Sequence, residues 1–292
     1  MFKSSLLSLL FLFSSVGMST TYPNRVEKSL AQAYREHSPV QTRLAQDFLK
    51  KIPLKGDEVV LDIGCGDGRV TDLISKRVPL GKVKGIDVSA DMIDLAQKSF
   101  PEISFEQADG ATYSDDIKYD VIVCFSTIHW FTDQQAVLNN MKKLLKENGR
   151  MYILSYSPYD YYWKPMEDSV FSRKWSGVLD QNQFHAQLPR DELTKEIEQA
   201  GFLITSLNVI PEIVIFDGQE GYKKHVTGFL PHLRNLPKEQ HEELLKDIGE
   251  SFLKWNKPNS EGKIIQPHHI FEVMVAVAPS KTDDSVKYRY RR

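Results

Sequence analysis

The sequence predicts an α/β protein with a doubly wound, mostly parallel sheet of seven strands and a helical cap. Short apolar segments alternate with amphipathic segments between residues 57 and 157, as they do where helices connect parallel strands. This alternation breaks after residue 157, and two more strand-like segments follow towards the end of the chain. With 292 residues, the chain is long enough for one large domain with an added cap.

The first expected elements lie at the start of the core. Residues 28–52 carry apolar side chains such as Leu44 and Phe48 at helical spacing, which predicts amphipathic helices. Val59–Ile63 is apolar and β-branched like a buried strand, and the glycine-rich turn behind it opens into a helix at about Arg69. In a doubly wound sheet, ligands lie beyond the carboxyl ends of such strands.

The remaining segments complete the sheet and the cap. We expect helices over 70–78, 90–100, 135–147 and 190–201, and strands over 82–88, 103–108, 119–126, 149–157, 202–216 and 269–279. Residues 158–190 are rich in aromatics without regular periodicity, and residues 219–256 are helical in pattern. Together with 28–52 they are expected to form a cap over the core 57–157, within one domain spanning 28–279.

Both ends of the chain are expected to lie outside this domain. Residues 1–20 combine Lys3, an apolar stretch and small residues, as a secretory signal does, but the stretch is shorter than the ~20 apolar residues of a membrane span. The two cysteines do not indicate a disulfide framework, so a cytoplasmic location is favoured, with export or anchoring through residues 1–19 as the alternative. Residues 280–292 are expected to be a flexible basic tail.

Composition argues against several classes of partner. Lys and Arg number 37 against 39 Asp and Glu, a net charge of -2, which gives no electrostatic reason to expect binding to nucleic acid. Cys65 has no His/Cys set near it in the sequence, so we expect a small packing residue and no metal site. The sequence does not indicate an oligomeric state.

The glycine-rich turn predicts a nucleotide site of an unusual kind. Gly64, Gly66 and Gly68 read G-x-G-x-G, and Arg69 stands where a dinucleotide-binding turn has its third glycine, which disfavours NAD. No Lys-Ser or Lys-Thr follows, which excludes a P-loop. Asp87, at the end of the next strand, is placed to accept two hydrogen bonds from a ribose diol. The pattern therefore favours a nucleoside without a pyrophosphate.

Four spaced motifs, "LDIGCGDG", "GIDVSADMI", "FEQADGATY" and "FSTIHWF", resemble the successive cofactor motifs of class I S-adenosylmethionine-dependent methyltransferases. The resemblance covers roughly residues 58–157 and implies a Rossmann-like fold, methyltransferase activity and S-adenosylmethionine as cofactor. The binding set that it implies is Asp62, Gly64, Cys65, Gly66, Asp87, Val88, Met92, Asp109, Gly110 and Ser126.

Roles for several of these residues follow from the same resemblance. Asp62 and Gly64 would meet the methionine end of the cofactor, with Ser126 beside it, and Asp87 would bind the ribose. Met92 would lie on the adenine face, and Asp109 would take the adenine amino group. Two alternatives stay open, because a methionine at this spacing also fits a helix core and an aspartate after a strand also forms turns.

Three further segments, "YREHSPVQ", "STIHW" and "FLPHLRNLP", are similar to those of the trans-aconitate and juvenile-hormone-acid methyltransferases, which methylate a small carboxylate. The acceptor implied is a small organic acid. We hypothesise that Gln41, His129 and Trp130 hold it, because amide and indole N–H groups can donate to an anionic oxygen, and that Tyr34 helps to close the site. His129 can donate a hydrogen bond or act as a base.

Other interpretations remain open at this point. The acceptor could be a hydroxyl or a quinone-type ring with His129 as base, or the chain could be a non-catalytic binding protein with the same fold. His232 and Arg234 are candidates for binding a second carboxylate, or have a capping or surface role. The aromatic residues that could line an acceptor pocket, or could merely cover the sheet, are Tyr159, Tyr161, Tyr162, Trp163, Phe171 and Trp175.

Overall fold

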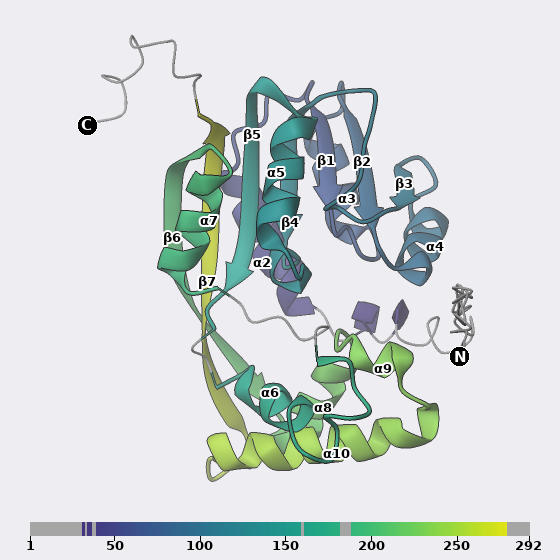
Figure 1. Cartoon of the computed structure of the whole chain (residues 1–292), viewed down its shortest axis with the longest axis vertical. Coiled ribbons are helices and arrows are strands. Elements are labelled where there is room, and N and C mark those ends of the chain that lie inside the picture. The colour runs from purple at the N-terminus through teal and green to yellow at the C-terminus, as the bar shows by residue number, and fades with distance from the viewer. Residues whose placement is uncertain (1–30, 33, 37–38, 159–160, 182–187, 279–292) are drawn as a thin grey trace, which may run out of the picture.

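The computed structural model in Figure 1 describes residues 31–32, 34–36, 39–158, 161–181 and 188–278. The expected leader, the expected basic tail, the beginning of the segment 28–52 and Tyr159 lie outside the described residues. Within the described ranges, no helix is both long and apolar enough to cross a membrane.

Seven strands form a single sheet in the order β3-β2-β1-β4-β5-β7-β6. Their bounds are Val59–Ile63 (β1), Lys82–Asp87 (β2), Ser104–Gln107 (β3), Tyr119–Phe125 (β4), Leu145–Tyr156 (β5), Phe202–Phe216 (β6) and Ile264–Val277 (β7). Strands β1 to β5 pair in parallel, whereas β7 is antiparallel to both β5 and β6. The chain winds outward from β1 to one edge and then from β4 towards the other, which confirms the predicted fold class.

Helices cover both faces of the sheet. The described helices are α2 (Pro39–Lys51), α3 (Arg69–Arg77), α4 (Ala90–Ser99), the 3-10 turn η1 (Ile128–Trp130), α5 (Gln134–Leu144), α6 (Lys164–Val170), α7 (Arg190–Gln199), α8 (Gly218–Thr227), α9 (His232–Asn235) and α10 (Lys238–Trp255). Val121 and Val123 of β4 pack towards α2 and α3, while Ile122 and Cys124 pack towards α5 and α7. Because side chains alternate along a strand, this continuous apolar run is what a strand buried on both faces requires.

The cap lies beyond the carboxyl ends of the parallel strands, at the end of the sheet to which the arrow of β5 points (Figure 1). It contains α6, α8, α9 and α10, with α10 packed against α6 and α8. Its interior is apolar, and the ring of Phe252 stacks on that of Tyr222 with centroids 3.8 Å apart. Both side chains are fully buried, so each contributes roughly 2–3 kcal/mol of hydrophobic free energy to holding the cap together.

Two predicted boundaries in the helical segments are wrong. The helix expected over 135–147 ends at Leu144, because Leu145 leaves it to pair with Tyr119 at the start of β5, where its side chain is buried. The helical stretch expected over 219–256 is divided into three helices, with Pro231 and Pro237 preceding the second and third. Proline lacks the N–H that a continuing helix needs, so each one restarts the helix instead of extending it.

Two other expectations were incomplete. The aromatic segment 158–190, where no regular structure was predicted, contains the short helix α6. The last strand starts at Ile264 and not at His269, since residues 264–268 pair with the final residues of β6. This extension places His268 close to the cap, next to the site described below.

Candidate active site

A large cavity of about 450 Å³ opens at the carboxyl ends of β1, β2 and β4, and parts of the cap also line it. Eight residues of the predicted cofactor set line it, namely Gly64, Gly66, Asp87, Val88, Met92, Asp109, Gly110 and Ser126. Its volume falls in the range of roughly 300–1,000 Å³ that is usual for small-molecule sites.

Asp87 connects the glycine turn to this cavity. Its carboxylate accepts hydrogen bonds from the backbone N–H groups of Gly66 at 3.0 Å and of Ser89 at 2.9 Å. Burial raises the pKa of Asp87, while these two bonds and the positive charge of Arg234 in the cap oppose that shift. The carboxylate is thereby fixed at the cavity wall, and its remaining lone pairs can accept hydrogen bonds from a diol.

The glycines of the turn serve two different purposes. Gly64 has φ of 76°, and a Cβ there would overlap the side chain of Thr127, which packs against it from the loop after β4. Gly66 has φ of 54°, but a Cβ there would meet only the ring of Tyr34, at 3.6 Å, among the described residues. Gly64 is therefore required by the protein's own packing, whereas Gly66 leaves room on the cavity side for a ligand to approach the backbone.

The other side of the large cavity is built from the segments after β2 and β3. Met92 is buried in the first turn of α4, and Val88 is 64% exposed. The carboxylate of Asp109 accepts the backbone N–H of Ala111 at 2.9 Å, so it does form a turn, and it also lines the cavity. The turn-forming and ligand-binding interpretations of Asp109 are thus compatible.

Asp62 and Cys65 line a smaller pocket of about 30 Å³, which shares Tyr34, Gly64 and Ser126 with the large cavity. The hydroxyl of Thr71 donates to Asp62 at 2.7 Å, and burial raises the pKa of this carboxyl to about 7. Burial also raises the pKa of the Cys65 thiol, which keeps it protonated and unreactive. A cation beside Asp62 would therefore stabilise the ionised form of this carboxyl.

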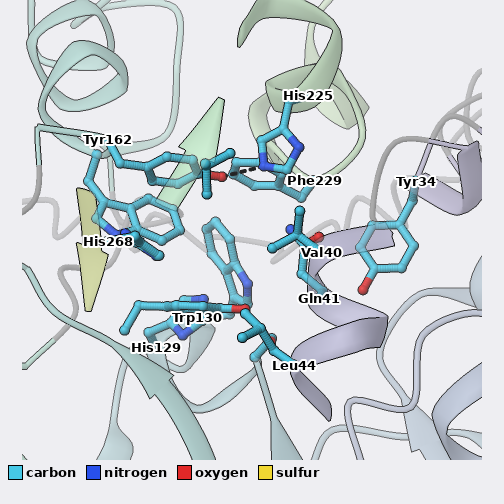
Figure 2. Close-up of a pocket in the computed structure, with 14 residues that line it drawn as sticks. Tyr34, Val40, Gln41, Leu44, His129, Trp130, Tyr162, His225, Phe229 and His268 are labelled. Carbon is cyan, nitrogen blue, oxygen red and sulfur yellow. Dashed lines mark hydrogen bonds between the residues drawn. The ribbon is translucent and has the colours of Figure 1, made fainter. Parts of the chain in front are cut away.

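A third space, which we call the aromatic cavity, lies next to the large cavity and measures about 50 Å³ (Figure 2). It brings together all four predicted acceptor residues, Tyr34, Gln41, His129 and Trp130. The rest of its lining is Val40, Leu44, Ser126, Tyr156, Tyr162, Trp163, Val214, His225, Phe229 and His268. Tyr34, Ser126 and Trp130 also line the large cavity, so they stand between the two spaces.

His129 is a buried and neutral group in the wall of the aromatic cavity. His129 is 2% exposed, and burial together with the neighbouring His268 lowers its pKa to about 3. Within the described part of the chain, His129 Nδ1 and the Oε1 atom of Gln41 have no hydrogen-bond partner. No Asp, Glu, Lys or Arg occurs among the described residues that line this cavity. The arrangement offers uncharged hydrogen-bonding groups inside an aromatic wall.

Sequence reasoning missed several residues of this cavity. Tyr156, at the end of β5, could have been found from the rule that ligands meet strand ends. His225 and His268 carry no local signal, since they belong to α8 and to the extended start of β7. The His225 ring nitrogen lies 2.6 Å from the hydroxyl of Tyr162, a contact drawn in Figure 2.

Some candidates do not reach the aromatic cavity. His232 is buried with its Nε2 atom 3.0 Å from the carbonyl oxygen of Asp180, and Arg234 lines the large cavity. Neither lines the aromatic cavity, and their proposed role in binding a second carboxylate stays a prediction. Among the candidate aromatics, Tyr162 and Trp163 line the aromatic cavity, while Tyr161 and Phe171 are exposed and Trp175 is buried inside the cap.

Known proteins resemble this chain in sequence and in structure. A family model described as a methyltransferase domain matches residues 34–207. The chain is 28% identical to juvenile hormone acid O-methyltransferase from Bombyx mori, over 74% of this chain and 84% of that protein. It is 31% identical to trans-aconitate 2-methyltransferase from Azoarcus sp. (strain BH72), over 44% of this chain and only about half, 51%, of that protein. The YcgJ protein from Bacillus subtilis shares the fold, with a TM-score of 0.57 and 16% identity over 80% of this chain and 98% of that one.

Proposed function

Since this chain belongs to the methyltransferase-domain family, as a class I S-adenosylmethionine-dependent enzyme acting on small molecules, we propose that its acceptor atom is a carboxylate oxygen. The Bombyx mori and Azoarcus relatives are named for acid substrates, and both names support this choice. The chemistry of the aromatic cavity supports it independently.

We propose that the large cavity holds the cofactor, which supplies an electrophilic methyl group when bound. Asp87 would accept the ribose hydroxyls, Val88 and Met92 would contact the adenine face, and Asp109 and Gly110 would meet the adenine edge. Asp62, Gly64, Cys65, Gly66 and Ser126 would surround the methionine end. Two features support this fit: the open space beside Gly66, and a buried Asp62 with no basic side chain in ion-pair distance among the described residues.

Gln41, His129 and Trp130 would hold the acceptor in the aromatic cavity, with Tyr34 closing the boundary to the cofactor. A carboxylic acid with a pKa of about 4 is ionised roughly a thousandfold over its neutral form at neutral pH, so no base is required. The cofactor would supply the methyl group, and the ionised carboxylate oxygen would supply the lone pair that accepts it. No proton moves, and the role of these residues is to orient the acceptor.

The observation that carries the proposal is the charge state of the buried His129 ring. With a pKa of about 3, its ring is neutral at physiological pH and is too weak a base to deprotonate a phenol of pKa about 10. A neutral imidazole can still donate one hydrogen bond to an anionic oxygen. The aromatic cavity is therefore better suited to an acceptor that arrives already ionised.

The test is a panel of carboxylic acids and phenols with S-adenosylmethionine, in which methyl esters and methyl ethers are identified by mass spectrometry. We expect esters from acids, and a loss of acid turnover in Gln41→Ala and Trp130→Phe while cofactor binding stays intact. Gln199→Ala, on the exposed end of α7, is the control and should behave as wild type. Methyl ethers without esters would contradict the carboxylate and favour the hydroxyl alternative.

A further inference from the structure

Trp163, the residue directly before α6, carries an indole N–H that has no hydrogen-bond partner in the part of the chain that the structure describes. We propose that this N–H is a donor from the cap to the acceptor carboxylate, and that the aromatic cavity takes acids with a single carboxylate on an apolar body. The inference rests on the proposed carboxylate methylation and extends it to a further residue and a narrower class of acceptor.

The side chain of Trp163 is 6% exposed and lines the aromatic cavity. Its Nε1 atom has no hydrogen-bond partner among the described residues. An indole nitrogen can only donate, and a buried donor without an acceptor is unfavourable, so a ligand oxygen in this cavity would satisfy it.

The other tryptophans of the cap are arranged differently. The indole N–H groups of Trp175 and Trp255 each donate to an aspartate, Asp247 and Asp168 respectively, at 2.7 Å. The cap thus contains two tryptophans whose N–H groups are satisfied within the protein, and one, Trp163 in the wall of the aromatic cavity, whose N–H group has no partner among the described residues. This difference makes Trp175 a matched control for Trp163.

Trp163 also stands among the residues proposed to hold the acceptor. Its ring centroid lies 5.8 Å from that of His129 and 6.4 Å from that of Trp130, both in the 3-10 turn η1 that follows β4. Its ring is 4.7 Å from that of Tyr162 and 6.0 Å from that of Phe229, both from the cap. A carboxylate among His129, Trp130 and Trp163 would therefore be held by the sheet and by the cap together.

The charge of the cavity limits the rest of the acceptor. The proposed donors His129, Trp130 and Trp163 serve one carboxylate. No Lys or Arg is found among the described lining residues, so a second carboxylate would be buried with neither these donors nor an opposite charge. Arg234 of the cap lines the large cavity instead. There its positive charge opposes the rise in the pKa of Asp87. A wall of Val40, Leu44 and aromatic rings instead suits an apolar body.

The size of the cavity adds a condition. At about 50 Å³ it has room for a carboxylate group but not for the body of a larger acid. The body of a larger acid therefore needs space beyond the cavity as it stands in this structure.

The experiment compares Trp163→Phe with Trp175→Phe, using octanoic, cinnamic and trans-aconitic acids at saturating S-adenosylmethionine. In Trp163→Phe we expect KM for octanoic and cinnamic acids to rise about tenfold or more, as for a lost bond to a charged group, with the Kd of the cofactor unchanged. Trp175→Phe should keep the wild-type KM. The wild type should prefer octanoic over trans-aconitic acid by at least about a hundredfold in kcat/KM, because of the second and third carboxylates.

A measurement on the wild type guards against a variant that fails to fold. With isotope-labelled tryptophan, the indole N–H resonance of Trp163 should shift downfield with octanoic acid and not with octanol. If the wild type methylates acids but Trp163→Phe matches Trp175→Phe, or this resonance does not respond, the role of Trp163 is overturned and the proposed function stands. Equal turnover of trans-aconitic acid overturns the single-carboxylate class. Failure of the wild type to methylate any acid removes the proposed function as well.

Discussion

The side-chain oxygens of Ser126 and Tyr156 lie 2.5 Å apart, at the ends of the neighbouring strands β4 and β5. Ser126 has φ of 56°, the one positive value for a non-glycine residue in the described part of the chain. It also lines the large cavity, the small pocket beside Asp62 and the aromatic cavity. This strained residue, tied to Tyr156, therefore stands where the proposed cofactor and acceptor sites meet, and strain of this kind is commonly found at functional sites.

The contact between Ser126 and Tyr156 should be measurable as a coupling energy. We expect Ser126→Ala and Tyr156→Phe each to lower the free energy of unfolding by about 1 kcal/mol, as for a lost hydrogen bond. The double variant should cost less than the sum by roughly 0.5–1.5 kcal/mol, because the bond can be lost only once. Urea denaturation of the four proteins gives these values, and strictly additive costs would show that the two hydroxyls do not interact.

The two glycines of the turn should respond differently to alanine. Gly64→Ala forces a Cβ into Thr127 and adds left-handed strain of roughly 1–2 kcal/mol, so it should strongly destabilise the fold. Gly66→Ala adds the same backbone strain without a steric overlap, so the variant should fold. It should lose cofactor affinity, because its methyl group occupies the space proposed for the ligand. Thermal denaturation and calorimetry with S-adenosylmethionine separate the two effects. Normal cofactor affinity in Gly66→Ala would be inconsistent with a ligand at this turn.

Cofactor affinity should depend on the protonation of Asp62. The pKa of this carboxyl is raised to about 7 by burial, so below that pH it carries a proton. Binding an ammonium group favours the ionised form, and the proton must then leave. We therefore expect the Kd of S-adenosylmethionine to rise as the pH falls below about 7, by up to about tenfold per unit. Calorimetry in several buffers should show proton release on binding.

Asp62→Asn provides the control for this pH dependence. The variant should bind the cofactor more weakly than the wild type. Its Kd should not change with pH in this range, since residue 62 no longer carries a carboxyl group. Because the folded pKa of Asp62 is raised, its contribution to stability is complete at low pH and is lost as the pH rises through about 7. The cofactor-free variant should thus unfold at a higher temperature than the wild type at about pH 8. If Asp62→Asn kept the pH dependence of cofactor affinity, a group other than Asp62 would have to cause it.

The dependence of turnover on pH should distinguish an acid acceptor from a hydroxyl acceptor. With saturating cofactor and an acid that turns over, kcat should stay level from about pH 6 to 8, because His129 is neutral throughout and no base is needed. A steep fall of kcat with an apparent pKa near neutrality would instead point to an essential base. His129→Asn, which keeps a donor, should retain more activity than His129→Leu, which has none.

The residues that line the large cavity were largely predictable because the features that place them there are local in the sequence. Gly64 and Gly66 are positions where the backbone itself takes positive φ, and Asp87 is the last residue of β2. Such features are visible as short motifs, since a turn constrains the residues that form it. The acceptor residues Gln41, His129 and Trp130 could be proposed from resemblance alone, without any sign of what would surround them.

By itself, the sequence determined the doubly wound sheet, the order of its elements and the glycine turn at the large cavity, because apolar periodicity and glycine placement are properties of neighbouring residues. Only the tertiary structure decided the aromatic cavity, in which Gln41 of α2, Trp163 before α6 and His268 of β7 come together. It also decided that Asp62 and His129 titrate far from their ordinary ranges. Burial and the neighbours that cause it depend on how distant segments pack, and no local pattern records that.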